Sequence, residues 1–241
     1  LPISANTLAQ RFPGKRAFIT GAASGLGLAC AEILAREGWQ LILTDVDAPR
    51  LDLVASSFRR DGARVLAAAC DVRDAAAVDA LVNSAIAECG GIDLAIHCAG
   101  VALAGPFHAS TAEEWQWIFD INVHGVANCS RAVMRDMARG KGGLIINIAS
   151  VASFCTGPNM SAYNASKAAV VALSESLMQE YAAYGVQVTV SMPGFFRTRL
   201  IESARGPEKT LQAAARFIEE SGLEASEVAE EMLTAAARRR T

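Results

Sequence analysis

Three residues in the second half of the chain could together move a proton. Tyr163 and Lys167 stand four residues apart in the run Tyr-Asn-Ala-Ser-Lys, and Ser150 stands thirteen residues before the tyrosine. Residues four apart share one face of a helix, so the phenol and the ammonium can point into one cleft. A fixed ammonium stabilises the phenolate and lowers the pKa of a tyrosine below its usual value of about 10. Tyr163 is therefore a candidate general acid and base, although a Tyr and a Lys at this spacing are more often a solvated surface pair.

Short apolar runs alternate with helical patterns along the chain, and these elements must position the three residues. Apolar runs of strand length occupy residues 16–20, 40–44, 64–69, 92–97, 144–148 and 186–191. Helical patterns occupy residues 28–37, 48–60, 74–89 and 112–139, and the helix that carries Tyr163 extends to about residue 184. Strands that are apolar throughout and alternate with helices are typical of a parallel sheet covered on both faces. The pattern predicts a single-domain α/β fold, a Rossmann-like doubly wound parallel sheet with helices on both faces.

Residues that could do chemistry follow the ends of these strands. In doubly wound sheets, ligands bind beyond the carboxyl ends of the strands. The residues at these positions are Gly21, Asp45, Asp71, Cys98 to Gly100, Ser150, Pro193 and Gly194. One edge of the sheet is therefore expected to gather the functional site.

A glycine-rich turn joins the first strand to the first helix after it. Gly21, Gly25 and Gly27 would let the main chain turn sharply and approach a diphosphate, which the N–H groups and dipole of the helix start would bind. Asp45 follows Gly27 by eighteen residues, near the spacing at which an acid accepts the ribose hydroxyls of a dinucleotide. A carboxylate there should repel the extra phosphate of NADP, so NAD is the expected cofactor. Asp45 could instead cap a turn, and Asp71 could bind adenine or cap the next helix.

The composition disfavours several other classes of protein. The chain has 241 residues, is 52% hydrophobic and has a formal net charge of −3, which suits neither nucleic acid nor an anionic membrane as a partner. Its six cysteines form no Cys-x-x-Cys pair and no cluster with the three histidines, so no metal site is expected. The sequence shows no charged and then apolar leader. It also shows no uninterrupted apolar run close to the ~18 residues that a membrane-spanning helix needs. We therefore expect a cytoplasmic protein with reduced thiols.

Seven motifs occur in the order and spacing of one known family. They are Thr20 to Gly27 (TGAASGLG), Asp71-Val72, Cys98-Ala99-Gly100, Asn122, Ser150, Tyr163 to Lys167 (YNASK) and Pro193 to Thr198 (PGFFRT). Over about residues 15–200 the chain resembles the classical short-chain dehydrogenase/reductase family. The resemblance implies that Tyr163 is the catalytic acid and base, that Lys167 lowers its pKa and holds the nicotinamide ribose, and that Ser150 orients the substrate oxygen. It also implies that Asn122 supports a water relay behind the lysine.

The resemblance further divides the chain by role. Residues 15–150 would mainly bind the cofactor and residues 150–225 would supply catalysis and substrate binding, with 198–225 as a mobile cover or, alternatively, a plain surface hairpin of helices. The candidate cofactor residues are Gly21, Ser24, Gly25, Leu26, Gly27, Asp45, Asp71, Val72, Cys98, Ala99, Gly100, Tyr163, Lys167, Pro193, Gly194, Phe196 and Thr198. A homodimer or homotetramer is expected, although the closing strand that often builds the family's subunit contacts is not visible after a last helix over 226–240.

Two positions depart from the family pattern. Cys98 stands where the family usually has an asparagine that braces the sheet, which puts local stability in question more than catalysis. Ser24 precedes Gly25 where many NADP-using relatives have a basic residue, which agrees with NAD as the cofactor.

The predicted reaction is hydride transfer between NAD(H) and a secondary alcohol or ketone, coupled to proton transfer through Tyr163. The candidate substrate residues are Ser150, Val151, Phe154, Tyr163 and Phe195. The apolar side chains of Val151, Phe154 and Phe195 predict an apolar substrate, such as a cyclic or steroid-like alcohol, although the same residues could be plain core. The alternatives are an NADP-dependent carbonyl reductase and a non-catalytic dinucleotide-binding regulatory protein. The second would be expected to have lost Tyr163 or Lys167, and an epimerase or dehydratase is a weaker match.

Overall fold

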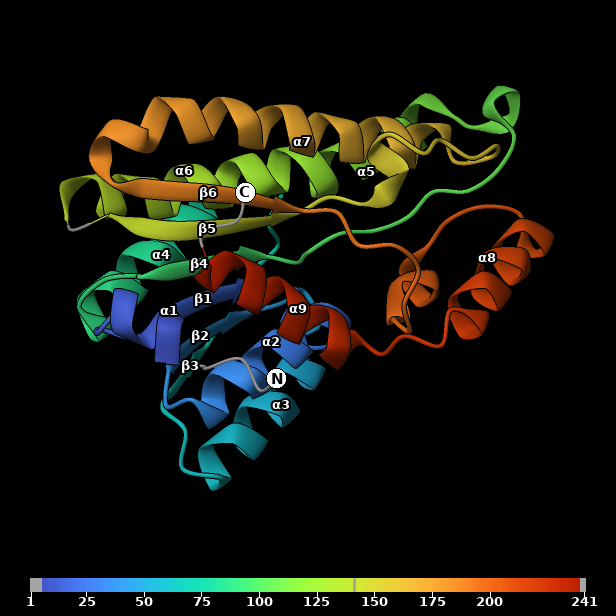
Figure 1. Cartoon of the computed structure of the whole chain (residues 1–241). Helices are drawn as coiled ribbons and strands as arrows, with labels where there is room; N and C mark the ends of the chain where they lie inside the picture. The colour runs from blue at the N-terminus through green and yellow to red at the C-terminus, as the bar shows by residue number, and fades with distance from the viewer. Residues whose placement is uncertain (1–5, 141, 239–241) are drawn as a thin grey trace.

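Six parallel strands form one sheet in the order β3-β2-β1-β4-β5-β6 (Figure 1). The computed structural model describes residues 6–140 and 142–238. Within these ranges the strands are β1 (Arg16–Thr20), β2 (Gln40–Thr44), β3 (Val65–Ala67), β4 (Leu94–His97), β5 (Gly143–Ile148) and β6 (Val186–Ser191). The strand order reverses between the neighbours β1 and β4. Their carboxyl ends therefore flank the crevice in which doubly wound sheets bind ligands.

The segments between the strands are mainly helical. The longer helices are α1 (Asn6–Arg11), α2 (Gly25–Arg36), α3 (Ala48–Arg60), α4 (Ala75–Cys89), α5 (Ala112–Phe119), α6 (Gly125–Arg139), α7 (Ser161–Tyr181), α8 (Glu208–Glu220) and α9 (Ala225–Ala237). The short ones are η1 (Phe107–Ala109), η2 (Asp120–His124), η3 (Val151–Ser153), η4 (Ala182–Tyr184) and η5 (Arg199–Ser203). Across the described ranges, none of these helices is long and apolar enough to cross a lipid bilayer.

Successive residues of each central strand enter opposite cores. Ile19 of β1 packs with residues of α2 and α9, whereas Phe18 packs with residues of α4 and α6. Both side chains are fully buried. Figure 1 shows the same two layers, with α6 and α7 on one side of the sheet and α1, α2 and α9 on the other. The strands are apolar throughout because neither face meets water, and the predicted doubly wound α/β fold is confirmed.

The two ends of the described chain pack against each other. The predicted arm over residues 1–14 contains α1, and its Arg11 donates a hydrogen bond to the carbonyl of Ala236 over 2.9 Å. Arg11 also donates to Oε1 of Gln187. A guanidinium at the last carbonyls of α9 satisfies acceptors that the helix leaves open and favours its dipole. The helix predicted over 226–240 is α9 (Ala225–Ala237), and residues 239 and 240 of the prediction lie outside the described residues.

His97 ends β4 as a fully buried histidine between β1 and β5. Burial lowers the pKa of its imidazole from 6.5 to about 4, because a charged ring would lose its hydration there. The unfolded chain therefore takes up a proton near pH 6.5 and the folded chain only near pH 4. This histidine leaves stability intact above about pH 6.5 and lowers it by up to about 3 kcal/mol as the pH falls towards 4.

We expect His97→Asn to remove this part of the acid sensitivity. Urea unfolding of parent and variant between about pH 7 and about pH 4 should show that the variant loses about 2 to 3 kcal/mol less stability than the parent. His108→Asn is the matched control because His108 is exposed, and it should follow the parent. Equal pH dependence in His97→Asn and the parent would contradict the assignment.

Candidate active site

Helix α7 carries Tyr163 and Lys167 on one buried face. The Lys167 ammonium donates to the main-chain carbonyl of Ile148, at the end of β5, over 2.9 Å. Lys167 Nζ lies 5.8 Å from the centroid of the Tyr163 ring. Ser150 follows Ile148 by two residues, and its side chain interacts with the Tyr163 phenol. The structure therefore brings Ser150, Tyr163 and Lys167 together at the carboxyl end of β5.

Burial shifts the pKa values of both titratable groups on α7. It lowers the pKa of the Lys167 ammonium from 10.5 to about 8 and raises the pKa of the Tyr163 phenol, while the interaction with Ser150 pulls the phenol back part of the way. The expectation that Lys167 lowers the pKa of Tyr163 is therefore not met by the chain itself. The physical reason is that withdrawal from water disfavours the charged form of each group.

A π-helical turn, η2, aims Asn122 at the loop after β4 and divides the helix predicted over 112–139. The Oδ1 atom of Asn122 accepts from the Val101 N–H over 2.8 Å. Its Nδ2 donates to the Val101 carbonyl over 2.9 Å and to Ser166 Oγ over 3.0 Å, and that hydroxyl donates to the Tyr163 carbonyl over 2.8 Å. The amide of Asn122 thus braces the loop after β4 and the helix of Tyr163. Its part in a water relay stays a prediction.

The glycine-rich turn is packed too closely for side chains at two positions. Gly21 has a φ of +64°, and a Cβ there would lie 2.8 Å from the Ala99 nitrogen. A Cβ on Gly27 would lie 2.2 Å from the Gly21 oxygen. The position of a Cβ on Gly25 is 3.0 Å from Thr198 Oγ1. Three of the predicted cofactor segments therefore meet at the start of α2, and they leave main-chain N–H groups of a helix end in the arrangement that binds a diphosphate.

Asp45 directly follows β2 and lies beside this turn. Its Oδ2 accepts from the Ala23 N–H and its Oδ1 from the Asp47 N–H, each over 3.0 Å. The carboxylate therefore braces the turn, as its alternative interpretation predicts, and its role towards the ribose hydroxyls stays a prediction. Val46 follows with 72% of its surface exposed. Val46 was not among the predicted cofactor residues, although it is an apolar residue directly after Asp45 in the sequence. An exposed apolar side chain at this place suits contact with the face of a purine.

Asp71 is paired with an arginine that sequence analysis also missed. The Arg73 guanidinium donates to both carboxylate oxygens of Asp71, over 3.0 Å to Oδ1 and over 2.5 Å to Oδ2. This pair lowers the pKa of the Asp71 carboxyl. Asp74, rather than Asp71, caps α4 by accepting from Ala76 and Ala77. Asp71 is therefore not the cap of this helix. If its carboxylate binds the adenine amine, the amine would share the carboxylate with Arg73.

The thiol of Cys98 faces α2. It interacts with the thiol of Cys30, and this interaction, together with burial, raises the pKa of Cys30. Cys98 is half-buried and packs against the core that contains α2, β1 and α9. A thiol therefore takes the bracing position in which the family usually has an amide.

The remaining candidate cofactor residues lie at the same edge in different surroundings. The side chains of Leu26 and Val72 are buried in the two cores. Phe196 packs partly against the core of α2 and α9, and the Pro193 carbonyl accepts from the Val151 N–H over 3.0 Å. The space around Gly194 is open. Leu26, Val72 and Phe196 can therefore shape the cleft mainly through their main chain.

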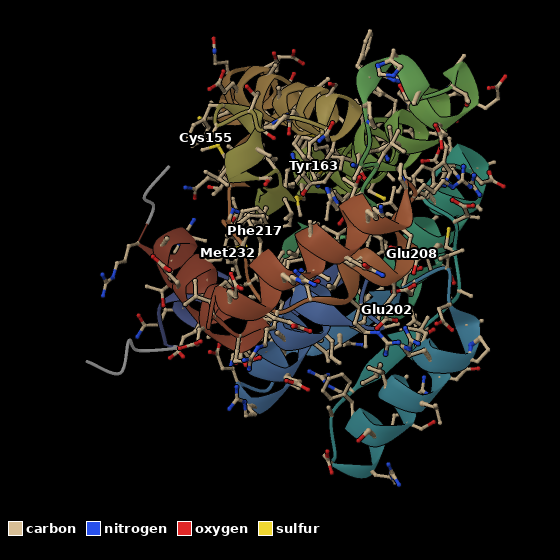
Figure 2. All side chains as sticks on the ribbon, turned by 90° about the vertical axis from the view of Figure 1, so that its right-hand side faces the viewer. Cys155, Tyr163, Glu202, Glu208, Phe217 and Met232 are labelled. Atoms are coloured by element: carbon tan, nitrogen blue, oxygen red, sulfur yellow. The ribbon has the colours of Figure 1, made fainter. Side chains whose placement is uncertain are left out.

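The segment 198–225 spans this end of the sheet and is fixed at two places. A parallel bridge joins Arg205 to Leu103, and a second joins Arg197 to Glu224. Helix α8 lies between these two bridges in the sequence, and Ile218 is its buried residue. Figure 1 shows α8 on the right, beyond the carboxyl end of β6. In Figure 2, which looks at this end of the molecule, Phe217 and Glu208 of α8 lie below Tyr163 in the view, and Glu202 of η5 lies lower still.

Aromatic rings line the edge of this segment. Phe217 of α8 stacks on Phe195, with 5.9 Å between the ring centroids. Both remain more than half exposed. Phe154, after η3, is 64% exposed, so these predicted substrate residues are not core. Val151 is half-buried at the start of η3.

The ring of Tyr163 lies in an apolar cluster between the loop after β4 and the segment 198–225. The cluster includes Leu103, Ile118, Met160 and Leu200. A cavity of about 300 Å³ opens next to it, between the loop 103–110, the first turn of α7 and residues 206–207. Ala162 of α7 lines this cavity, whereas Ser150, Tyr163 and Lys167 are not among its lining residues.

The chain is similar to known proteins over most of its length. The family model described as short chain dehydrogenase matches residues 15–209. The chain is 37% identical over 190 residues to 2,3-dihydro-2,3-dihydroxybenzoate dehydrogenase of Bacillus subtilis (strain 168), which covers 79% of this chain and 73% of the relative. It is 34% identical over 212 residues to cis-4-hydroxycyclohexanecarboxylate dehydrogenase of Sinomonas cyclohexanicum, covering 88% and 85%. The crystal structure of a short chain dehydrogenase/reductase from Burkholderia phymatum in complex with NAD has a TM-score of 0.86 and 35% identity, covering 94% and 87%.

Proposed function

Because this chain belongs to the short chain dehydrogenase family, we propose that it transfers a hydride between NAD(H) and a secondary alcohol or the corresponding ketone. The observation that carries the proposal is the meeting of Ser150, Tyr163 and Lys167 at the sheet edge that also holds the glycine-rich turn. A titratable phenol beside a cradle for a dinucleotide suits proton-coupled hydride transfer. In this proposal, residues 15–150 mainly bind the cofactor and residues 198–225 cover the substrate.

Tyr163 is the proposed proton donor to a ketone oxygen and the acceptor from an alcohol. Because burial raises the pKa of its phenol, the free protein holds this proton at neutral pH and is ready to act as an acid. The Ser150 hydroxyl would orient the substrate oxygen, and the Lys167 ammonium would stabilise the phenolate after the proton has left. A bound nicotinamide supplies or accepts the hydride.

NAD is the proposed cofactor because of the charge beside the ribose position. Two main-chain N–H groups hold the Asp45 carboxylate in place. It therefore cannot easily turn away from the extra phosphate of NADP. Like charges brought together in this way cost several kcal/mol and select against the wrong ligand. NADP is the alternative.

We expect Asp45→Ala to relax this selection. The ratio of kcat/KM with NADP to kcat/KM with NAD should rise about a hundredfold, because the repulsion of the extra phosphate is removed. Initial rates with each cofactor measure it. Asp47→Ala is the matched control, since it removes the same charge two residues away, from the cap of α3. An unchanged ratio in Asp45→Ala, or an equal rise in both variants, would refute the role of Asp45.

The proposed substrate is an apolar, alicyclic secondary alcohol or its ketone. The apolar cluster around Tyr163 and the exposed rings of Phe154 and Phe195 support an apolar ligand. The names of the two curated relatives describe hydroxylated six-membered rings that carry a carboxylate. Here, Arg197 and Arg199 are paired with Glu224 and Glu202, so neither guanidinium is freely available to a substrate carboxylate.

A panel of alcohols tests the proposed function directly. Cyclohexanol, larger alicyclic alcohols and their carboxylated analogues would each be offered with NAD and with NADP, and the absorbance of the reduced nicotinamide would be followed. Turnover of the uncharged rings in preference to the carboxylated ones supports the proposal. Binding of NADH without turnover of any alcohol or ketone in a broad panel would favour the non-catalytic regulatory protein instead.

A further inference from the structure

Four buried polar side chains form a chain of hydrogen bonds beneath the candidate site. His97 Nδ1 lies 2.8 Å from Asn147 Oδ1 and 3.3 Å from Ser130 Oγ. Asn147 Nδ2 donates to Ser174 Oγ over 3.0 Å, and Ser174 Oγ donates to the Val170 carbonyl over 2.7 Å. His97, Asn147, Ser130 and Ser174 are each at most 1% exposed. Polar groups at this depth are costly unless they are well paired, so their arrangement needs a reason.

The directions of the bonds that run from His97 through Asn147 and Ser174 to Val170 follow from the last acceptor. The Val170 carbonyl can only accept, so the Ser174 hydroxyl gives it its proton and accepts from the amide of Asn147. The carbonyl oxygen of that amide then faces His97, whose Nδ1 must carry the proton. A neutral ring satisfies this requirement, and burial keeps it neutral by lowering the pKa of His97 to about 4. The network is thus a single, fixed arrangement at neutral pH.

This network lies directly beside the contact that holds Lys167. Asn147 precedes Ile148, whose carbonyl accepts from the Lys167 ammonium over 2.9 Å. Ser174 follows Lys167 by seven residues, two turns along the same side of α7. Strand β5 and helix α7 are therefore joined twice by adjacent residues of the strand, once through Asn147 and Ser174 and once through Ile148 and Lys167.

We propose that His97, Asn147 and Ser174 form a positioning network that sets α7 against β5 and so fixes the Lys167 ammonium. His97 holds the Asn147 amide in the orientation that reaches Ser174, and Ser174 fixes α7 two turns beyond the lysine. Lys167 is buried, and its ammonium donates to a carbonyl over 2.9 Å, so a small shift of α7 would change both its hydration and its reach. The proposal rests on the proposed function, in which Lys167 stabilises the Tyr163 phenolate and holds the cofactor.

Ser174→Ala tests the network, with Ser176→Ala as its matched control. Ser176 is an exposed serine on the same helix that makes the same kind of bond, to the Ala172 carbonyl over 3.0 Å. The main readout is the titration of Lys167 itself, followed by NMR in protein labelled with ¹³Cε-lysine. The chain has four lysines, so the spectrum of Lys167→Met identifies the resonance. The second readout is the affinity for NADH, measured by fluorescence.

In the parent and in Ser176→Ala, Lys167 should titrate near pH 8. In Ser174→Ala, the midpoint should rise by about one pH unit, since a loosened ammonium regains hydration. The Kd for NADH should rise about tenfold, the size of one weakened charge-assisted hydrogen bond. An unchanged Lys167 midpoint in Ser174→Ala would overturn the proposal whatever happens to NADH. Failure of the parent to bind NADH would instead refute the proposed function, and the lysine titration would still be read.

Two further variants separate positioning from general destabilisation. Val82→Ala removes buried methyl groups of α4 away from the network and should lower stability without moving the Lys167 midpoint. A shift in Val82→Ala equal to that in Ser174→Ala would also overturn the proposal. If Ser174→Ala does not fold, His97→Gln tests the same network from its other end and should raise the midpoint in the same direction.

Discussion

Tyr163→Phe is expected to lower turnover about a thousandfold while it leaves the affinity for NADH nearly unchanged. The phenol is buried against Leu103, Ile118 and Met160, and the ring supplies most of these contacts. Phenylalanine preserves the ring and removes the proton that the substrate oxygen needs. The loss should therefore appear in kcat, because the missing interaction belongs to the transition state. Steady-state rates and a fluorescence titration with NADH give the two quantities.

Tyr181→Phe is the matched control for this experiment. Tyr181 lies on the same helix, removed from the site, and its ring packs against Tyr184 with 5.8 Å between the centroids. Loss of its hydroxyl should leave kcat at the parental value. Retention of more than about a tenth of parental turnover in Tyr163→Phe would refute the acid–base role, since a positioned acid or base contributes at least about a hundredfold.

The apolar runs and helical patterns were enough to predict the sheet and the edge that carries the site. The reason is local, because a strand buried on both faces must be apolar at every position, as Phe18 and Ile19 are. The spacing of Tyr163 and Lys167 likewise predicts a shared helix face, and both side chains are buried on α7. In these cases a residue and its near neighbours in sequence carry the information.

Features that depend on distant contacts could not be predicted from the sequence. The π-helical turn η2 adds one residue to a helix whose apolar pattern looks continuous, and it is the amide of Asn122 that meets Val101 and Ser166 from two other elements. Helix α1 is only six residues long, and Arg11 ties it to Ala236 at the other end of the chain. Isolated helices of that length are unstable in water, so a pattern search does not find them.

The pKa of Tyr163 shows the same limit in energetic terms. The four-residue spacing correctly placed an ammonium near the phenol, with Lys167 Nζ 5.8 Å from the ring centroid. It did not reveal how far the pair is withdrawn from water, and burial is the largest influence on both groups. Desolvation depends on every element packed around a site, which the local sequence does not contain.

Lys167→Met is expected to abolish turnover and at the same time to stabilise the folded protein. The folded chain holds the pKa of Lys167 at about 8, below the 10.5 of an unfolded lysine, so at neutral pH the fold carries a buried ammonium at a cost of about 3 kcal/mol. Methionine fills a similar volume without charge. Loss of the bond to the Ile148 carbonyl offsets about 1 kcal/mol of the gain. The variant should therefore be about 2 kcal/mol more stable at pH 7.

The pH dependence identifies the cause of this stabilisation. The cost of the buried ammonium is fully present below about pH 8 and disappears as the pH rises above the unfolded pKa of 10.5, so the advantage of Lys167→Met should shrink between these values. Urea unfolding near pH 7 and near pH 10 measures it. Lys15→Met is the matched control, because Lys15 also donates to a main-chain carbonyl, that of Glu37 over 3.0 Å, but is only half-buried. If Lys167→Met is less stable than its parent at pH 7, the prediction is wrong. Lys167 would then stabilise the fold instead of lowering its stability.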